Sequence, residues 1–412
     1  MDTAPKPAWP SVTREERPWT TNPDQVGADG ARPTRPERMM TAITVQVPAR
    51  IAEATVEVST DTVALIEAAA VALTRLQARA EHLAGLSELL VRTEAVATSK
   101  IERIYADMDD LARATVGAQA ATSAGSTIAA AQALTALTAS TDGGKPLTGA
   151  AVLAAHQRLL GDDPAERDYA GAYRTMQNWV GGSDLTPYGS AHVPPPPRLV
   201  APLMDDLLAF ANRDDLSAVA QAAVVHAQFE AIHPFTDGNG RVGRGLIGAV
   251  LRRRGLTRSV TVPAAAAMLA DVDTYFDHLL GYREGDADSM VAYLARAAIG
   301  AAEAAEESAG HLAALRPEWM EAVKPRKNSA AHKMIEGLLR SPILDIERAL
   351  ALTGAAKGRT YEALDRLSEA KVLAEISHGS RNRIWVASDV MTEMRELEER
   401  IGVRTKPSKR WT

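Results

Sequence analysis

The segment from His233 to Arg244 combines residue types that suit chemistry on a phosphate anion. Glycine flanks Asn239 on both sides, and glycine permits backbone angles that let several N–H groups point at one anion. A helix expected over 241–253 adds the partial positive charge of its N-terminus at the same place. Arg241 and Arg244 share the first turn of that helix, so we expect both to project toward the same anion.

A carboxylate and an imidazole complete the set. Asp237 lies at the edge of the loop, where its carboxylate could hold Mg²⁺ on phosphate oxygens. His233 precedes the loop, and the ordinary pKa of histidine suits it to accept a proton near neutral pH. These residues predict nucleotide chemistry, with a base, a metal ligand, a phosphate cradle and two charge clamps. The alternative is a helix-capping glycine turn beside a structural histidine.

These residues resemble the Fic (Fido) family of protein adenylyltransferases. The family signature is His-x-Phe-x-Asp/Glu-Gly-Asn-Gly-Arg-x-x-Arg, and its fixed positions are matched by His233, Phe235, Asp237, Gly238, Asn239, Gly240, Arg241 and Arg244. The resemblance covers about residues 60–300. It implies a mainly α fold, namely a Fic-type helical bundle with a small β-hairpin flap expected near residues 176–180. In the family, this flap holds the target segment by backbone pairing.

The resemblance also implies an activity, which is transfer of AMP from ATP to a Ser, Thr or Tyr hydroxyl of a target protein. His233 would accept the hydroxyl proton, and Asp237 would hold Mg²⁺ between the α- and β-phosphates. The backbone of Gly238, Asn239 and Gly240, together with the Asn239 side chain, would bind phosphates. Arg241 and Arg244 would clamp the outer phosphates, and Tyr275 would lie near the base. For Tyr275, simple aromatic packing is an equal alternative.

A second motif lies upstream of the signature. Family members often carry an inhibitory helix with the pattern Ser/Thr-x-x-x-Glu-Gly/Asn, which Thr98 and Glu102 match. In the family this glutamate pairs with the second signature arginine, here Arg244, and removes the clamp for the γ-phosphate. Arg103 stands where Gly or Asn is usual, and its charge could draw Glu102 away from Arg244. The alternative is a solvated helix face, and the resemblance leaves open whether Glu102 also supports removal of AMP.

The bulk composition agrees with a helical protein in a reducing compartment. The chain of 412 residues is 46% hydrophobic, and alanine and leucine, which favour helices, supply most of this fraction. Cysteine is absent, which excludes disulfides and thiolate metal sites. We find no apolar run long enough to cross a bilayer and no apolar core of a secretion signal. We therefore expect a cytoplasmic protein with no membrane contact.

The chain divides by pattern into five segments. We expect a disordered leader over 1–38, a helical region carrying the inhibitory helix over 39–145, the Fic catalytic domain over 146–310, a winged helix-turn-helix domain over 320–390 and a tail over 391–412. The winged helix is expected from three helices at 329–339, 343–352 and 360–370, and from strands at 372–377 and 383–387 joined by a polar turn at 378–382.

Charge is unevenly spread along the chain. The net charge is −6, whereas residues 321–412 carry 18 Lys and Arg against 13 Asp and Glu, or +5. A basic C-terminal domain suggests a nucleic-acid or acidic partner, and the candidates for phosphate contact are Lys357, Arg359, Arg366, Arg381 and Arg383. Winged helices also dock proteins, so DNA binding and protein docking stay equal alternatives.

Three functions compete at this point. The first is AMP transfer to a protein hydroxyl, restrained by Glu102, with self-modification and a homodimer suggested by relatives. The second is transfer of phosphate or another nucleotide, although relatives with those activities usually alter the signature. The third is a DNA-binding regulator whose Fic domain serves as a nucleotide-sensing or interaction module.

Overall fold

The computed structural model describes residues 9–27, 30–83, 85–376 and 383–406, and they form mainly helices, as predicted. Its helices are α1 (Arg35–Arg38), α2 (Thr60–Ala80), α3 (Leu86–Ile101), α4 (Met108–Thr115), α5 (Thr122–Ala139), η1 (Asp142–Gly144), α6 (Gly149–Leu160), α7 (Pro197–Ala211), α8 (Ala218–Ile232), α9 (Asn239–Arg253), α10 (Ala264–Ala270), α11 (Val272–Arg283), α12 (Ala287–Val323), α13 (Ala330–Leu338), α14 (Ile346–Thr353), α15 (Lys357–Glu369) and α16 (Ser388–Thr405). Its strands are β1 (Thr13–Pro18), β2 (Ala42–Val47), β3 (Ile343–Leu344), β4 (Leu373–Glu375) and β5 (Trp385–Ala387).

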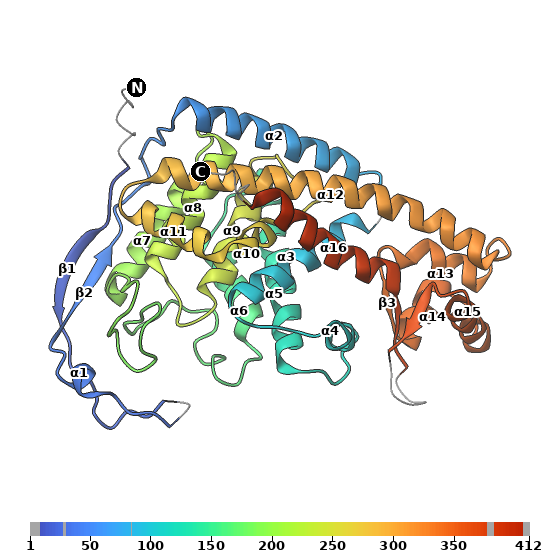
Figure 1. The fold of residues 1–412 in the computed structure, drawn as a ribbon, viewed down its shortest axis with the longest axis horizontal. Coiled ribbons are helices and arrows are strands. Elements are labelled where there is room, and N and C mark those ends of the chain that lie inside the picture. The colour runs from blue at the N-terminus through green and yellow to red at the C-terminus, as the bar shows by residue number, and fades with distance from the viewer. Residues whose placement is uncertain (1–8, 28–29, 84, 377–382, 407–412) are drawn as a thin grey trace, which may run out of the picture.

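Helix α8 lies at the centre of the bundle. It is apolar on every side and nearly all of its residues are buried, which is expected for a helix enclosed by others. Helices α7, α9 and α12 pack against it, and α5 and α6 pack together on the far side of α9. The long α12 runs beside α2 along one edge of the molecule (Figure 1). The many buried alanines let these helices approach closely.

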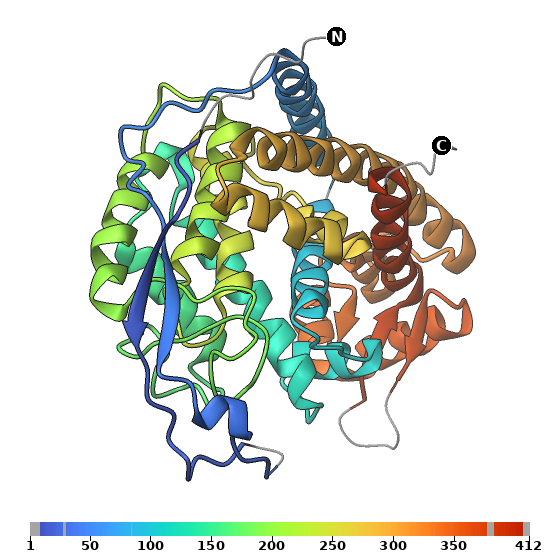
Figure 2. The ribbon, with the colours of Figure 1, turned by 60° about the vertical axis from the view of Figure 1, so that its left-hand side comes forward.

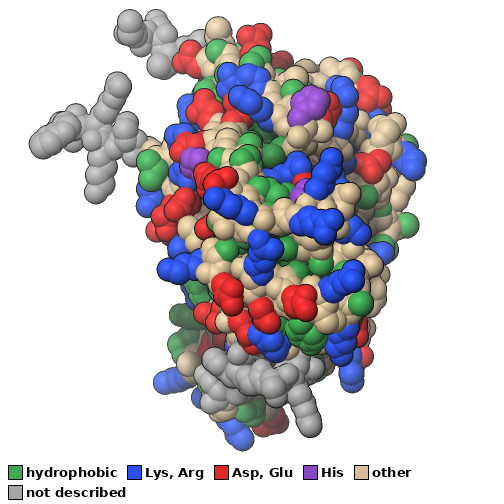
Figure 3. Space-filling view, turned by 90° about the vertical axis from the view of Figure 1, so that its right-hand side faces the viewer, with side chains coloured by type: hydrophobic (Ala, Val, Ile, Leu, Met, Phe, Trp, Pro, Cys, Tyr) green, Lys and Arg blue, Asp and Glu red, His purple; other side chains and the backbone are tan. Residues whose placement is uncertain are grey.

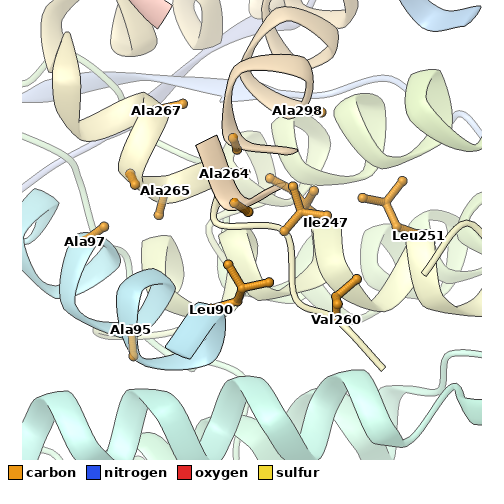
Figure 4. Close-up of a cluster of buried hydrophobic side chains, with 14 of the residues drawn as sticks. Leu90, Ala95, Ala97, Ile247, Leu251, Val260, Ala264, Ala265, Ala267 and Ala298 are labelled. Atoms are coloured by element: carbon orange, nitrogen blue, oxygen red, sulfur yellow. The ribbon is translucent and has the colours of Figure 1, made fainter. Parts of the chain in front are cut away.

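Helix α3 carries Thr98 and packs into the body of the protein. Its Leu90 belongs to one apolar cluster with Ile247 of α9 and Ala264 of α10 (Figure 4). At its start, Gly85 has φ +91°, and a Cβ there would collide with the carbonyl of Leu339. Near its end, Lys100 forms an ion pair with Glu398 of α16 at 2.6 Å. Helix α3 is therefore fixed at both ends by residues from the C-terminal part of the chain.

The N-terminal segment is ordered where it is described. Strand β1 pairs antiparallel with β2, and the hairpin lies along the outside of the bundle (Figure 2). The prediction of a disordered leader over 1–38 is therefore wrong for its described part, while residues 1–8 and 28–29 lie outside it. The segment lacks apolar periodicity, but it gains backbone pairing with β2, and Trp9 is buried against Phe210 and Tyr282.

The C-terminal module, residues 330–387, contains α13, β3, α14, α15, β4 and β5 in that order. Its strands form a sheet of order β3-β5-β4, so three strands replace the two that we expected. Residues 343–344, expected to begin a helix, form β3 instead, because Ile343 and Leu344 are buried against β5. The expected polar turn at 378–382 lies outside the described residues.

The expected limits of the last segments fall inside helices. Helix α12 continues without a break through residues 310 and 320, and it joins the bundle to the C-terminal module. The expected tail begins within α16, which folds back against α3, α10 and α12. Within the described part of the chain, none of the helices has the length and apolar character needed to span a membrane.

Candidate active site

The signature loop joins two buried helices. Helix α8 ends at Ile232, its C-cap His233 adopts a left-handed conformation with φ +50°, and α9 begins after Gly238, which has φ +76°. A Cβ on Gly238 would lie 2.9 Å from Leu159 Cδ2, so both the angle and the packing require glycine. The glycine turn thus places the N-terminus of α9 directly beside the end of α8.

Two side chains hold the loop in this shape. Asn239 accepts a hydrogen bond from the Phe235 amide at 2.8 Å and donates one to the Phe235 carbonyl at 2.9 Å. The Asn239 oxygen and one of its amide hydrogens are therefore used within the loop, so Asn239 helps to shape it, while the expected phosphate contact stays a prediction. The Phe235 ring stacks on His156 at 3.7 Å between ring centroids.

His156 is a supporting residue that sequence reasoning missed. Its ring is fully buried, and burial lowers its pKa below the ordinary value. Nδ1 accepts from the Gly171 amide at 2.9 Å, so the proton is on Nε2, which donates to the Asp237 carbonyl at 3.0 Å. His156 thereby ties the signature loop to the segment that leads into the flap. His156 lies 81 residues before Asp237 in the sequence, and no sequence pattern around it predicts this role.

His233 lies partly buried at the mouth of the loop. Its carbonyl accepts from Arg174 Nε at 2.9 Å, and its Nδ1 lies 2.9 Å from Asn178 Nδ2. Burial lowers its pKa to about 3, and the positive charges of Arg174 and Arg283 act in the same direction. The imidazole is therefore neutral at physiological pH, which is the form that can accept a proton.

The expected flap contains an isolated antiparallel bridge between Val180 and His192, where we expected a short hairpin near 176–180. The N-terminal hairpin braces it, because the Gln46 amide of β2 donates to the Val193 carbonyl at 2.8 Å. The buried Glu37 accepts from Ser183 and from Thr186, and these bonds, with those from Thr34, lower its pKa to about 2. A charged carboxylate therefore anchors the flap to the N-terminal segment.

Asp237 and Arg241 face one another on the outer side of the loop. Arg241 Nη2 donates to Asp237 Oδ2 at 3.0 Å, and its Nη1 donates to Ser126 of α5 at 3.0 Å. Asp237 is 54% exposed, so its carboxylate is open to an incoming cation. The pKa of nearby Glu166 is raised, first by burial and then by the charges of Asp237 and Asp163. This acidic setting and these oxygen donors fit Mg²⁺ that also binds phosphate.

Arg244 points to the other side, toward α3, so the two arginines do not converge on one point. Its side chain is buried, its Nε donates to Thr98 Oγ1 at 2.6 Å, and its Nη2 lies 2.5 Å from Glu102 Oε1. Tyr275 is buried beside it, with its hydroxyl 3.5 Å from Arg244 Nη1 and 3.0 Å from His226 Nε2. Tyr275 thus contacts the clamp arginine.

The Glu102 carboxylate also lies over the start of α9. A Cβ added to Gly240 would collide with Glu102 Oε1, and it would lie 2.9 Å from both terminal nitrogens of Arg244. The Glu102 carboxylate therefore lies beside the first turn of α9 and against the Arg244 guanidinium.

The turn that ends α3 explains why the inhibitory-helix pattern has Gly or Asn directly after the glutamate. Glu102 is the C-cap, Arg103 follows with φ +60°, and the amides of Arg103 and Ile104 donate to the carbonyls of Lys100 and Ser99. This is a Schellman turn, in which glycine or asparagine is favoured at the left-handed position. Arg103 is exposed and occupies that position at some conformational cost, and Glu102 pairs with Arg244.

Some basic residues of the C-terminal module are engaged within the protein, whereas Arg359 and Arg366 line one hollow together with Arg326, Lys327 and Lys333. Arg366 donates to the carbonyls of Val323 and Lys324, and Arg383 pairs with Glu375 and lies 4.7 Å over the Trp385 ring. Lys357 and Arg359 are exposed, and Arg381 lies outside the described residues. Lys and Arg alternate with Asp and Glu on the face shown in Figure 3.

Comparison with known proteins places the signature loop in a family. The family model described as "Fic/DOC family" matches residues 146–251, which include α6 to α9 and the whole loop. This chain contains a Fic domain. The match ends near the end of α9, whereas we expected the Fic catalytic domain to extend over 146–310.

Curated relatives share the Fic domain with this chain. Over 149 residues the chain is 33% identical to a protein adenylyltransferase Fic of Nematostella vectensis, which is 35% of this chain and 31% of that protein. Over 75 residues it is 41% identical to a probable protein adenylyltransferase of Aquifex aeolicus, which is 18% of this chain and 23% of that protein. The chain thus spans less than a third of either relative.

A solved structure resembles a larger part of the chain. The crystal structure of a Fic family protein from Desulfovibrio desulfuricans matches 81% of this chain and 97% of that chain, with a TM-score of 0.54 and 20% identity. At this level of identity the likeness concerns the fold alone. It extends well beyond the Fic domain itself.

Proposed function

We propose that this chain transfers AMP from ATP to a Ser, Thr or Tyr hydroxyl of a protein. The observation that carries the proposal is the position of the Glu102 carboxylate, which reaches from the end of α3 to Arg244 and Gly240 in the first turns of α9, just after the loop that begins at His233. The curated relatives of the Fic domain, which are named protein adenylyltransferases, support ATP as the nucleotide.

In the proposed reaction the target hydroxyl oxygen attacks the α-phosphorus of ATP. A new P–O bond forms, the bond to the β-phosphate breaks, and pyrophosphate leaves. The hydroxyl proton passes to the neutral imidazole of His233. The left-handed turn at His233 and its carbonyl bond to Arg174 hold the backbone, and Asn178 contacts the ring. Catalysis then comes from positioning and from stabilisation of phosphate charge.

The glycine-rich start of α9 and the two arginines would each bind different phosphates of ATP. The amides that begin α9, at Asn239 and Gly240, would bind the inner phosphates, with Arg241 approaching from the Asp237 side. Arg244 would bind the γ-phosphate once Glu102 leaves. Asp237 would hold Mg²⁺, which, when bound, supplies positive charge against the phosphate oxygens.

In this proposal the pair of Glu102 and Arg244 inhibits AMP transfer, and we call this pair the brake. Arg244 is buried, so removing its partner without a replacement would leave an uncompensated charge. The carboxylate therefore persists until a triphosphate replaces it or α3 moves. Whether Glu102 also supports removal of AMP stays a hypothesis, as do self-modification and a homodimer.

We infer that the C-terminal module is a winged helix, from its three helices and three-stranded sheet. The alternative function, a DNA-binding regulator with a nucleotide-sensing Fic domain, is not favoured, because Arg366 and Arg383 are engaged within the protein. For the module itself, DNA binding and protein docking stay alternatives.

Labelled ATP tests the proposed function. Cell lysate is incubated with the native chain, Glu102→Gly or His233→Ala, and with ATP labelled at the α- or the γ-phosphate. We expect strong α-label transfer by Glu102→Gly, weak transfer by the native chain, none by His233→Ala, and no γ-label transfer by any of them. Transfer of the γ-label would identify a phosphate transferase, and equal labelling by Glu102→Gly and native protein would contradict the brake.

A further inference from the structure

Asn178 lies in the segment expected to form the flap and contacts the proposed base directly. Its Nδ2 atom is 2.9 Å from His233 Nδ1 and 2.8 Å from the Phe235 carbonyl oxygen. Its backbone is held by Gln177, whose side-chain amide donates to the carbonyls of Asn178 and Pro194. The side chain thus connects the flap, the base and the signature loop.

The Phe235 carbonyl fixes which way the Asn178 amide points. A carbonyl oxygen only accepts hydrogen bonds, so the amide atom beside it must be the NH₂ group. The same NH₂ group faces His233 Nδ1 and uses its second hydrogen there. Nδ1 must therefore be the unprotonated nitrogen, and the proton of the neutral ring lies on Nε2.

The side-chain oxygen of Asn178 is the remaining polar atom of this amide. Asn178 Oδ1 is buried and has no hydrogen-bond partner among the described residues. Buried polar groups are nearly always paired, so an unpaired one in a native structure needs an explanation. The orientation of Asn178 is therefore set by its two acceptors, at the expense of its own oxygen.

We infer that Asn178 masks the proposed base: its amide occupies the Nδ1 lone pair that must accept the target proton, and the target hydroxyl has to replace it. This inference rests on the proposed function for its meaning. Asn178 is a positioning residue, because it acts through His233. Since it belongs to the flap, a target segment that pairs with the flap would move the mask and bring the hydroxyl in one step.

Other charged groups near the ring do not explain this tautomer. Arg174, Arg283 and His192 lie close enough to affect the protonation of His233, and the two arginines disfavour the imidazolium. None of the hydrogen bonds found between described residues joins Arg283 or His192 to His233 Nδ1, and Arg174 bonds the His233 carbonyl. Replacing Asn178 leaves all three groups in place.

Nuclear magnetic resonance of ¹⁵N-histidine in the full chain tests the inference without ATP. Nε2 is recognised by its correlations to both carbon-bound ring protons, and the His233 signals are assigned by their loss in His233→Ala. In the native chain we expect Nε2 to be the protonated nitrogen. In Asn178→Ala we expect a mixture of tautomers and a pKa raised by about one unit, because a donor to the neutral ring is lost. A protonated Nδ1 in the native chain would overturn the inference.

The matched variant is Asn178→Asp, which offers Nδ1 an acceptor of similar size. We expect the proton to move to Nδ1 and the His233 pKa to rise further than in Asn178→Ala. An unchanged tautomer and pKa in both variants, with native thermal unfolding, would reduce Asn178 to a structural amide and overturn the inference.

Activity supplies a separate readout in the Glu102→Gly background. Adding Asn178→Ala should move the acidic limb of the labelling rate to higher pH by about one unit, in parallel with the pKa. A purely structural role would lower the rate equally at every pH, and that outcome contradicts the mask. If Glu102→Gly itself transfers no label, the proposed function fails, while the tautomer result still decides the position of the proton.

Discussion

Glu102 Oε1 lies 2.5 Å from Arg244 Nη2 and 2.0 Å from the point that a Cβ on Gly240 would occupy. One carboxylate therefore pairs with Arg244 and lies beside the first turn of α9 at the same time. In the proposed function, a triphosphate would bind Arg244 only after this carboxylate moves. Variants of the residues that contact this pair should change the rate of protein labelling or the stability of the fold.

The Thr98 hydroxyl accepts from Arg244 Nε at 2.6 Å, and in the proposed function this bond holds Arg244 in its inhibited position. Thr98→Val keeps the shape and leaves this buried N–H unpaired, at a cost of about 1 kcal/mol or more. We expect labelling to rise about fivefold above native, short of the Glu102→Gly level. Thr98→Ser, which keeps the hydroxyl, should stay close to native. Equal labelling by the Val and Ser variants would show that the hydroxyl does not hold the brake.

Arg103 occupies the left-handed position of the turn that ends α3, with φ +60°. Arg103→Gly should relieve this conformation and stabilise the protein by about 1 kcal/mol, as measured by urea unfolding. A firmer turn should also hold Glu102 more tightly and lower labelling. Arg103→Ala separates the effect of the Arg103 charge from that of the backbone angle, because it removes the charge and keeps the strained angle. A gain in stability with Ala equal to that with Gly would assign the effect to charge.

Glu94 is a second carboxylate on α3, buried and bonded to the Ala265 amide at 2.8 Å. Burial raises its pKa from 4.5 to about 8, so its folded form holds a proton that the unfolded chain loses. The resulting stability is fully present below about pH 4.5 and is lost as the pH rises toward 8. Glu94→Gln keeps the acceptor and removes the titration, so it should be more stable than native at pH 8 by about 1 kcal/mol or more. Urea unfolding at pH 5 and pH 8 measures this difference, and an equal difference at both values would contradict the assignment.

The signature could be predicted from the sequence because its groups are local. His233, Gly238 and Arg244 fall within one short loop and one helical turn, so spacing alone places them near each other. Thr98 and Glu102 were found through the family pattern, and the structure adds that Arg103 occupies the turn position where that pattern has Gly or Asn.

The remaining parts of the site depend on contacts between distant segments. His156 stacks on Phe235, Asn178 reaches His233 from the flap, and Glu37 anchors the flap from the N-terminal segment. Such contacts leave no periodic signal in the sequence. The same reason applies to β1, whose polar residues are ordered by pairing with β2 and by the ion pair of Arg14 with Glu284.

The mass added to protein by Glu102→Gly, measured by mass spectrometry after incubation with ATP and cell lysate, tests the central claim most directly. The matched control is the double variant Glu102→Gly with His233→Ala, which retains the released clamp and lacks the proposed base. We expect the mass of one AMP on a Ser, Thr or Tyr residue with the single variant, and no addition with the double variant. Addition of a phosphate group alone, or equal modification by both variants, would contradict AMP transfer through His233.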